Sequence, residues 1–407
     1  CGDNVVQVGV DSCDDGNRYN GDACSNACRV ARCGDGLLRR DLQPGDAGFE
    51  ACDFGDDNSL CSQCQLLWPQ TLASGDGHSC ALIGGQVSCW GDNRWSQVDG
   101  SADGSELTAR PEILAIEGVP ISVSAGGSHS CLISENASHC FGRSREGQLF
   151  ANARILTYHN QVWRNGASSL SAGGNASCVV TAGNLFCMGT MTEHESFGRI
   201  TQLAANLAPT RVAIGAEHYC IESASGVYCS GSNRLSQIDD DDNSYEYIIG
   251  ISGNTPLRVA VGSAITCLIE EGQARCRGSA TKGRLGRGGN GHCGVQCAQG
   301  WGQVSNLTTI IDLKIGDSHV CALDAYGRVF CWGDNSRGAL GIADSGIHSE
   351  PGAQVPLPLP VATLSAGKQF SCAQLIDERV FCWGQNDRGQ LGRNFASAQE
   401  APGAISP

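Results

Sequence analysis

The chain has 407 residues, of which 41% are hydrophobic, and carries a formal net charge of −15. This length allows a large core or several domains, but no segment approaches the 18 or more apolar residues that a membrane-spanning helix requires. The acidic balance argues against partners such as nucleic acid or an anionic membrane face.

The 24 cysteines indicate the compartment. A reducing cytosol would keep them as thiols, whereas their even number and regular pairing are typical of disulfides in an oxidising environment. The first residues lack a basic region followed by an apolar run. We therefore expect an extracellular or cell-surface protein from which a signal peptide has already been removed.

Residues 1–65 form a predicted cysteine-rich segment with few apolar residues. Its two four-cysteine units, 1–28 and 33–64, both open with Cys-Gly-Asp, and the part before Gln65 holds twelve Asp and Glu against five Arg. Cross-links must restrain a segment that cannot build a normal core. Three pairings within each unit stay open. The cysteines are Cys1, Cys13, Cys24, Cys28, Cys33, Cys52, Cys61 and Cys64.

Two positions in this segment have a second interpretation. Cys61 and Cys64 have the spacing of a redox motif, but no strand-to-helix context lowers a thiol pKa there, so a structural disulfide is favoured. Cys1 stands where a lipoprotein carries its lipid anchor. Because Cys1 completes a four-cysteine unit, we favour a disulfide and keep lipidation as the alternative.

From residue 66 onward, Gly-x4-Cys-x8-or-9-Cys-x-Gly occurs seven times at a period of 42 to 54 residues. Such a period predicts a propeller or a solenoid. We expect a disulfide within each repeat. The pairs are Cys80–Cys89, Cys131–Cys140, Cys178–Cys187, Cys220–Cys229, Cys267–Cys276, Cys321–Cys331 and Cys372–Cys382.

The stretch between the paired cysteines predicts a β-hairpin. A turn centred on Gly84-Gly85 places Cys80 opposite Cys89, and two glycines suit the positive φ angles of a two-residue hairpin turn. The sixth repeat is one residue longer, and a three-residue loop ending in Gly327 keeps its cysteines opposite. Each cross-link closes a loop worth roughly 2–3 kcal/mol by chain entropy, less where the hairpin already holds its ends together.

Two further features recur after the second cysteine. An aromatic residue follows it in four repeats, as Trp90, Phe141, Trp332 and Trp383. A Gly-Gln-Leu-like step then appears, beginning at Gly147, Gly283, Gly338 and Gly389.

Three sets of side chains raise the question of a metal site. His78, His129, His218 and His319 stand two residues before the first cysteine, and we interpret them as packing residues because equivalent positions in a ring point apart. Cys293 and Cys297 predict a local disulfide, with zinc binding beside His292 or pairing to another chain as alternatives. Asp239, Asp241 and Asn243 are a weak calcium candidate, because Ser244 and Gly250 stand where an EF-hand needs Gly and Glu.

Leu-Ser-Ala-Gly-x3-Ser-Cys-Ala followed by Val-Phe-Cys-Trp-Gly-x-Asn-x2-Gly-Gln-Leu-Gly resembles the repeat of the regulator of chromosome condensation family. The best copies are 312–341 and 361–392. The resemblance implies an all-β fold, a seven-bladed β-propeller over 66–407 built of four-stranded blades. It also implies a ring closed by pairing strands from the two chain ends, here 66–73 and the tail near Ala401–Ile405. The cysteine pairs look like those of a secreted version.

Residues 1–36 resemble the cysteine-rich repeat of myxobacterial surface proteins, and 33–64 do so loosely. That resemblance implies a location rather than an activity.

No Gly-x-Ser-x-Gly elbow, His-Glu-x-x-His helix or phosphate-binding Gly-Lys-Ser/Thr loop is found. We therefore expect a non-enzymatic scaffold without a cofactor, whose propeller presents loops to a protein partner. One alternative is self-assembly into a fibre or surface layer, with the cysteine-rich segment of one copy docked on the propeller of the next. Another is a secreted inhibitor or a glycan-acting protein, since a related secreted propeller inhibits β-lactamases and glycosidase carboxylates need not be close in sequence.

Overall fold

The computed structural model describes most of the repeat region and parts of the N-terminal segment. The described residues are 6–7, 12–17, 22–32, 61–62, 65–66, 71–100, 107–116, 118–135, 137–149, 155–164, 167–191, 196–203, 207–239, 249–251, 258–288, 298–393 and 400–405. The chain forms two compact units, Cys1–Pro69 with Asp324–Gly327, and Gln70–Leu323 with Arg328–Pro407. Within the described residues no helix has the length and apolar character needed to cross a membrane.

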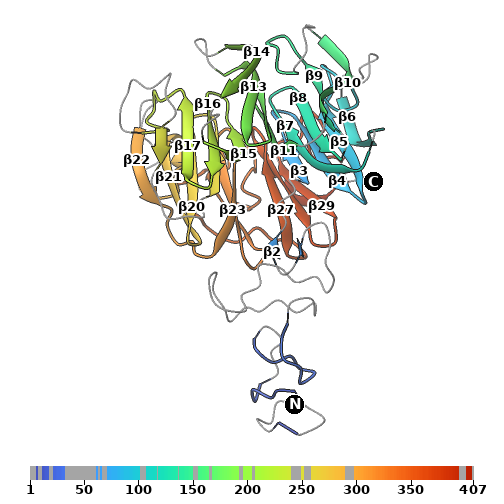
Figure 1. Ribbon diagram of the computed structural model, residues 1–407. Coiled ribbons are helices and arrows are strands. Elements are labelled where there is room, and N and C mark those ends of the chain that lie inside the picture. Colours follow the sequence, from blue (N-terminus) through green and yellow to red (C-terminus); the bar gives the residue numbers. More distant parts are fainter. Residues whose placement is uncertain are drawn as a thin grey trace. The chain divides into compact units, whose positions relative to one another are not determined.

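The second unit is a ring of seven four-stranded antiparallel sheets, numbered here as blades 1 to 7 (Figure 1). Blade 1 consists of β3 (Leu72–Ser74), β4 (His78–Ile83), β5 (Gln86–Asp92) and β6 (Leu107–Ile113), and blade 2 of β7 (Pro120–Ala125), β8 (His129–Ser134), β9 (Ala137–Arg143) and β10 (Ile155–Arg164). Blade 3 consists of β11 (Ala167–Gly173), β12 (Asn175–Thr181), β13 (Asn184–Thr190) and β14 (Ser196–Leu203). Blade 4 consists of β15 (Pro209–Ile214), β16 (His218–Ser223), β17 (Gly226–Gly231) and β18 (Ile249–Ile251).

Blade 5 consists of β19 (Arg258–Val261), β20 (Ile265–Glu270), β21 (Gln273–Ser279) and β22 (Ala298–Gln303). Blade 6 consists of β23 (Ile310–Ile315), β24 (His319–Asp324), β25 (Val329–Asp334) and β26 (Ile347–His348). Blade 7 consists of β27 (Val361–Ala366), β28 (Phe370–Leu375), β29 (Val380–Gly384) and β30 (Glu400–Ala404). A short 3₁₀ helix, η1 (Thr281–Gly283), follows β21. The first strand of each blade lines a central cavity of about 230 Å³. The seven-bladed propeller expected from the repeat is thus confirmed.

The second and third strands of each blade form the predicted cysteine hairpin. Cys80 pairs with Cys89 in the strand register, and Gly84 and Gly85 have φ of 57° and 75° in the turn. In the longer hairpin of blade 6, Gly327 has φ of 72°, and in blade 7 Glu378 takes the same conformation with φ of 66°. Each of the seven pairs is disulfide-bonded with a Cα–Cα distance of 4.1 Å.

The glycine before each hairpin is required by the narrowness of the ring. A Cβ atom at Gly367 would lie 2.7 Å from the carbonyl oxygen of Gly75, and one at Gly316 would lie 2.5 Å from that of Gly367. Cβ atoms do not tolerate such distances, so a side chain here would push neighbouring blades apart. The strongest repeat signal in the sequence therefore marks the innermost contact between blades.

The core lies between the blades. Among the described residues, seven clusters of buried apolar side chains each join two neighbouring blades. Between blades 6 and 7, for example, Leu340, Leu364 and Trp383 pack together, all fully buried. Because each face of a blade is covered only by its neighbours, no blade can bury its apolar surface alone.

Where the residue after the second cysteine is a tryptophan, its indole N–H also joins two blades through a hydrogen bond. The indole Nε1 of Trp332 donates a hydrogen bond to the carbonyl oxygen of Arg284 (2.8 Å), and that of Trp383 donates to Ala339 (2.9 Å). In blade 5 Arg277 replaces the aromatic residue, and its Nε donates to the Ser236 carbonyl oxygen (2.6 Å). The acceptors belong to the Gly-Gln-Leu-like step of the preceding blade.

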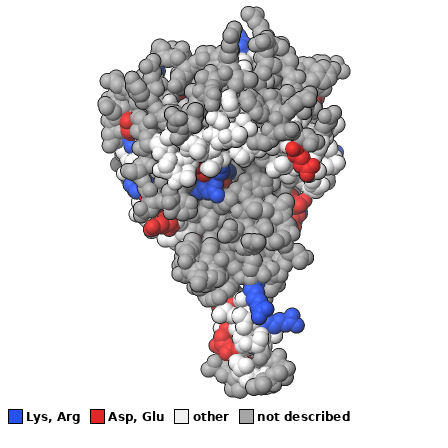
Figure 2. All heavy atoms as spheres, viewed as in Figure 1, with Lys and Arg blue, Asp and Glu red and all other residues white. Residues whose placement is uncertain are grey.

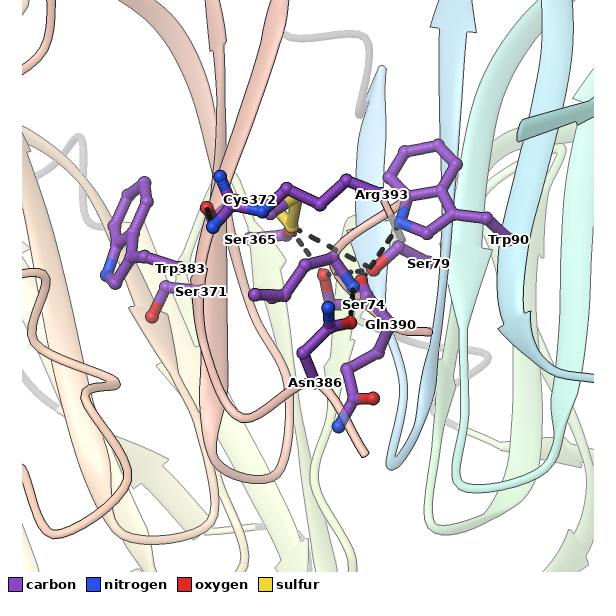
Figure 3. The surroundings of a disulfide bond; sticks show 12 residues. Ser74, Ser79, Trp90, Ser365, Ser371, Cys372, Trp383, Asn386, Gln390 and Arg393 are labelled. Carbon is purple, nitrogen blue, oxygen red and sulfur yellow. Dashed lines mark hydrogen bonds between the residues drawn. A yellow bond between two sulfur atoms is a disulfide. The ribbon is translucent and has the colours of Figure 1, made fainter. Parts of the chain in front are cut away.

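The expected closure by strands from both chain ends is wrong. The chain enters the ring at β3, the innermost strand of blade 1, and ends at β30, the outermost strand of blade 7, so every blade is contiguous in sequence. Side chains join the two end blades instead (Figure 3). Trp90 Nε1 donates to the Gln390 carbonyl oxygen (2.9 Å), and the hydroxyls of Ser74 and Ser365 lie 2.6 Å apart.

The first unit is described only in part. Cys13 is bonded to Cys24, and a β-bridge joins Cys24 to Val30. Cys28 is also disulfide-bonded. Strands β1 (Cys61–Ser62) and β2 (Gln65–Leu66) pair antiparallel. The predictions for Cys1, Cys33, Cys52 and Cys64, and for the Cys293–Cys297 pair, lie outside the described residues, and only the backbone of Cys61 is described.

Candidate binding face

The four histidines lie in four separate blade interfaces, where each contacts a hydroxyl of the next blade. The Nε2 atoms of His78, His129, His218 and His319 lie 2.7 to 2.9 Å from the hydroxyls of Ser130, Ser177, Thr266 and Ser371, respectively. Within the described part of the chain, no three His, Cys, Asp or Glu side chains converge as metal ligands would.

The proton positions follow from the hydrogen bonds. The Ser371 hydroxyl donates to the Ala339 carbonyl oxygen (2.9 Å), so it must accept from His319 Nε2–H, which leaves Nδ1 unprotonated. Nδ1 has no hydrogen-bond partner among the described residues. Burial lowers the pKa of His319 to about 4, because protonation would place a charge and an unpaired N–H in the core.

Of the three residues of the calcium candidate, the structure describes only Asp239. Asp239 accepts a hydrogen bond from the side-chain amide of Asn233, and Asp241 and Asn243 lie outside the described residues.

The stretch after the third strand forms a turn held by an asparagine. The Asn93 side-chain oxygen accepts from the backbone N–H of Val98 (2.9 Å), five residues on. The same bond links Asn233 to Ile238, Asn335 to Leu340 and Asn386 to Leu391, at 2.8 to 3.1 Å. We call these segments the Asn turns and use the name also for their counterparts in blades 2 and 5, where Ser144 and Ala280 replace the asparagine. The asparagine itself is fully buried in blades 1, 6 and 7.

A glutamine holds the same turns from the other side. The Gln97 side-chain oxygen accepts from the Trp95 N–H (2.8 Å), and Gln390 accepts likewise from Arg388 (2.8 Å). Gln148 and Gln237 make the equivalent bonds in blades 2 and 4. Since these amides fix the backbone, the residues between them project from a rigid base.

The Asn turns all lie on one face of the ring. The residue that leads into them bonds to the turn between the first two strands of its own blade, as Asp92 N–H does to the Gly77 carbonyl oxygen (2.8 Å). The cysteine hairpins turn at the opposite ends of the same strands. The ring therefore has an Asn-turn face and a hairpin-turn face.

The Asn-turn face carries one Lys or Arg between the clamping positions in six of the seven blades. These residues are Arg94, Arg145, Arg234, Lys282, Arg337 and Arg388. All of them are exposed except Arg388, which is partly buried. A cation recurs at this position although the chain as a whole has a net charge of −15.

Two aspartates fix some of these cations. Asp92 Oδ2 contacts Arg94 (2.6 Å) and Arg388 of the adjoining blade (2.5 Å), and Asp334 contacts Lys282 (2.9 Å). Burial opposes ionisation of Asp92, but hydrogen bonds from Arg94 and Arg388 hold the pKa of this carboxyl below its ordinary value. Arg145 and Arg337 are exposed and have no ion pair among the described residues.

Trp95 adds an apolar contact area to the face. Its side chain is 38% exposed, and the Arg143 guanidinium carbon lies 5.5 Å from its ring centroid. On the side of the molecule shown in Figure 2, the described charges occur as small separate groups rather than as one continuous patch. The cations of the Asn turns stand singly, one in each of six separate blades.

Two of the Asn turns were not predicted from the sequence. Ser96-Gln97-Val98 and Ser236-Gln237-Ile238 occupy the place of Gly-Gln-Leu in blades 1 and 4. Ser96 and Ser236 have φ of 59° and 54°, the left-handed conformation that the glycines have elsewhere. An Asn three residues before a Ser-Gln or Gly-Gln pair is the signal that finds them.

Family models match part of the repeat region, and known structures match the fold. The regulator of chromosome condensation (RCC1) repeat matches residues 310–339 and 361–390, and a second model of that repeat matches 326–374. Prp20p from Saccharomyces cerevisiae superposes with a TM-score of 0.67 at 16% identity, covering 84% of this chain and 87% of that one. Human WBSCR16 gives 0.61 at 20%, covering 74% and 86%.

Curated relatives share the repeats in different settings. The Arabidopsis thaliana ultraviolet-B receptor UVR8 is 25% identical over 81% of both chains. The human regulator of chromosome condensation is 31% identical over 33% of this chain and 32% of its own length. The mouse E3 ubiquitin-protein ligase HERC2 is 24% identical over 51% of this chain, which spans 4% of that ligase. The protein is a seven-bladed propeller, and it contains RCC1 repeats.

Proposed function

We propose that this propeller is a non-enzymatic extracellular scaffold that binds a protein partner through its Asn-turn face. The observation that carries the proposal is that side-chain amides hold the turns beneath exposed cations, through Gln148 below Arg145 and through Asn335 below Arg337. A rigid turn loses little conformational freedom on binding, so more of the interaction energy appears as affinity.

The chemistry of the face favours an acidic protein segment. Arg145 and Arg337 have unpaired guanidinium groups among the described residues, and guanidinium binds carboxylates through two parallel hydrogen bonds. The exposed indole of Trp95 provides an apolar anchor of the kind found at the centre of protein interfaces.

Two lines support the proposal of an extracellular binding protein. Seven hairpins each contain a disulfide, and such bonds persist in oxidising compartments and are rare in the cytosol. RCC1-like propellers commonly act as protein-binding scaffolds, and Prp20p, with the same fold, binds Gsp1p and histones.

The test uses a poly-glutamate peptide as a defined acidic probe and poly-lysine as the opposite charge. At about 0.15 M salt, where the screening length is about 8 Å, local charges decide binding rather than the net charge of the chain. We expect poly-glutamate to bind and the Arg145→Gln/Arg337→Gln variant to bind at least about tenfold more weakly, or about 1.4 kcal/mol.

The matched control is Arg110→Gln. Arg110 is exposed on β6, at the outer edge of blade 1 and away from the Asn turns. It should bind as the wild type does. Equal binding by all three proteins, or binding of poly-lysine, would contradict the proposed face.

A further inference from the structure

We infer that the partner of the Asn-turn face is the cysteine-rich segment of a second copy of this chain, so that copies join head to tail. The inference rests on the proposed function, because it names the occupant of the same face. It follows from the complementary charges and apolar contacts that one sequence carries on its two units.

The charge complementarity is internal to the chain. Residues 1–64 hold twelve Asp and Glu against five Arg, a net charge of −7 (5 − 12). The Asn-turn face carries a cation in six of seven blades, of which Arg145 and Arg337 have no ion pair among the described residues. Opposite charges on two surfaces steer their encounter and fix their register more than they add to affinity.

The described part of the segment presents two neighbouring carboxylates, Asp14 and Asp15, and each accepts a backbone hydrogen bond. The Cys13–Cys24 disulfide closes a loop, and Asp14 Oδ1 accepts from the Gly16 N–H (2.8 Å). Asp15 beside it is exposed. An acidic side chain held in this way loses less freedom on binding than one in a flexible tail.

Apolar side chains are exposed on both surfaces. Val30 is 42% exposed although the bridge to Cys24 fixes its backbone, and Val6 is 51% exposed. The Asn-turn face offers Trp95, with Arg143 beside its ring. A segment with few apolar residues gains burial for its exposed valines by docking against an aromatic anchor.

The two docking surfaces differ, so the contact is heterologous. Such a contact leaves one unused surface of each kind at the ends of every assembly, and it grows into a filament unless the rotation closes a ring. A symmetric dimer, in contrast, would use the same surface twice and stop at two copies.

The experiment mixes two full-length variants, each altered on one surface. Arg145→Gln/Arg337→Gln alters the face, and Asp15→Asn/Val30→Ser alters the segment. We expect the wild type to grow with concentration at about 0.01 M salt and to dissociate at about 1 M, where the screening length falls from about 30 to about 3 Å. Each variant alone should stay monomeric in light scattering.

The mixture gives the decisive result. The intact segment of the face variant should dock on the intact face of the segment variant, so the mass should rise to twice the 42.5 kDa of one chain and no further. Arg110→Gln should assemble like the wild type.

Three results would overturn the inference: a wild type that stays monomeric at low salt, assembly that the segment variant retains, or a mixture that stays monomeric while the wild type assembles. None of them affects the poly-glutamate titration, so a failed occupant and a failed binding face are told apart.

Discussion

His319 Nε2 and the Ser371 hydroxyl oxygen lie 2.8 Å apart and join blade 6 to blade 7 in the buried part of the ring. Ser371 passes the hydrogen bond on to Ala339, in the Asn turn of blade 6. In two of the three blades that lack the histidine, the partner position changes as well. Ala176 precedes a blade with Tyr219 and Ile265 precedes one with Val320, whereas Phe370 precedes a blade that keeps the hydroxyl of Ser79. The two positions therefore form one unit of packing.

The first prediction follows from this pairing. His319→Ile alone should lower the free energy of unfolding by about 1–3 kcal/mol, because the Ser371 hydroxyl loses its buried donor. Ser371→Val alone should cost a similar amount, since the imidazole N–H is then unpaired. The double variant copies Ile265 and Val320 and should recover part of the loss, with a coupling of about 0.5–3 kcal/mol.

Thermal unfolding of the four proteins measures the coupling. Simple additivity of the two single losses would show that the pair does not act as a unit.

The second prediction concerns acid. Burial lowers the pKa of His78 and His319 to about 4, and that of His129 and His218 to about 3. In the unfolded chain the same histidines have a pKa of about 6.5. Between the lowered pKa values of the folded chain and about 6.5, the unfolded chain therefore binds more protons than the folded chain. The contribution of these histidines to the free energy of unfolding should be fully present above about pH 6.5, and it should be lost progressively as the pH drops towards about 4.

The midpoint of thermal unfolding, measured from about pH 7.5 to about pH 4, checks the direction. The double variant His319→Ile/Ser371→Val should show a shallower fall than the wild type, because one titrating group is gone. A midpoint that rises on acidification would contradict neutral buried histidines.

The third prediction tests the ring of glycines. Gly367→Ala should cost about 1–3 kcal/mol, because its Cβ would meet the Gly75 carbonyl oxygen at 2.7 Å and the Phe370 ring. Gly352→Ala is the control, since a Cβ there meets nothing within 4 Å, and it should stay within about 0.5 kcal/mol of the wild type. Chemical denaturation distinguishes them, and equal midpoints would show that the ring can widen.

The extent to which the sequence predicts this protein differs between its parts. Gly84-Gly85 and the Cys80–Cys89 spacing predict the hairpin because turn type and register are local properties. The closure could not be predicted in this way. Repeats define the order of strands, but not the strand at which the chain enters the ring, since any starting strand buries the same apolar surface between blades.

The candidate binding face could be predicted from the sequence only in part, for a related reason. Four Gly-Gln-Leu-like steps could be recognised in the sequence. Two further turns were missed because Ser96 and Ser236 replace the glycine. The role of the asparagine depends on a hydrogen bond to a backbone group five residues away, which residue types alone do not display. Likewise, the hydroxyl partners of the four histidines are 48 to 52 residues distant in sequence.

The fourth prediction addresses the disulfides, on which the proposed extracellular location depends. Cys372→Ala/Cys382→Ala should lower the free energy of unfolding by up to about 2–3 kcal/mol, the chain entropy of a loop of this size. Because the strand register already holds the two cysteines opposite each other, we expect the lower part of this range and an unchanged fold. Peptide mass mapping of the wild-type protein without reductant should recover Cys372 linked to Cys382, and the six equivalent pairs likewise. Free thiols at these positions in protein isolated from its native compartment would contradict an oxidising location, and they would leave the propeller itself unaffected, since its core lies between the blades.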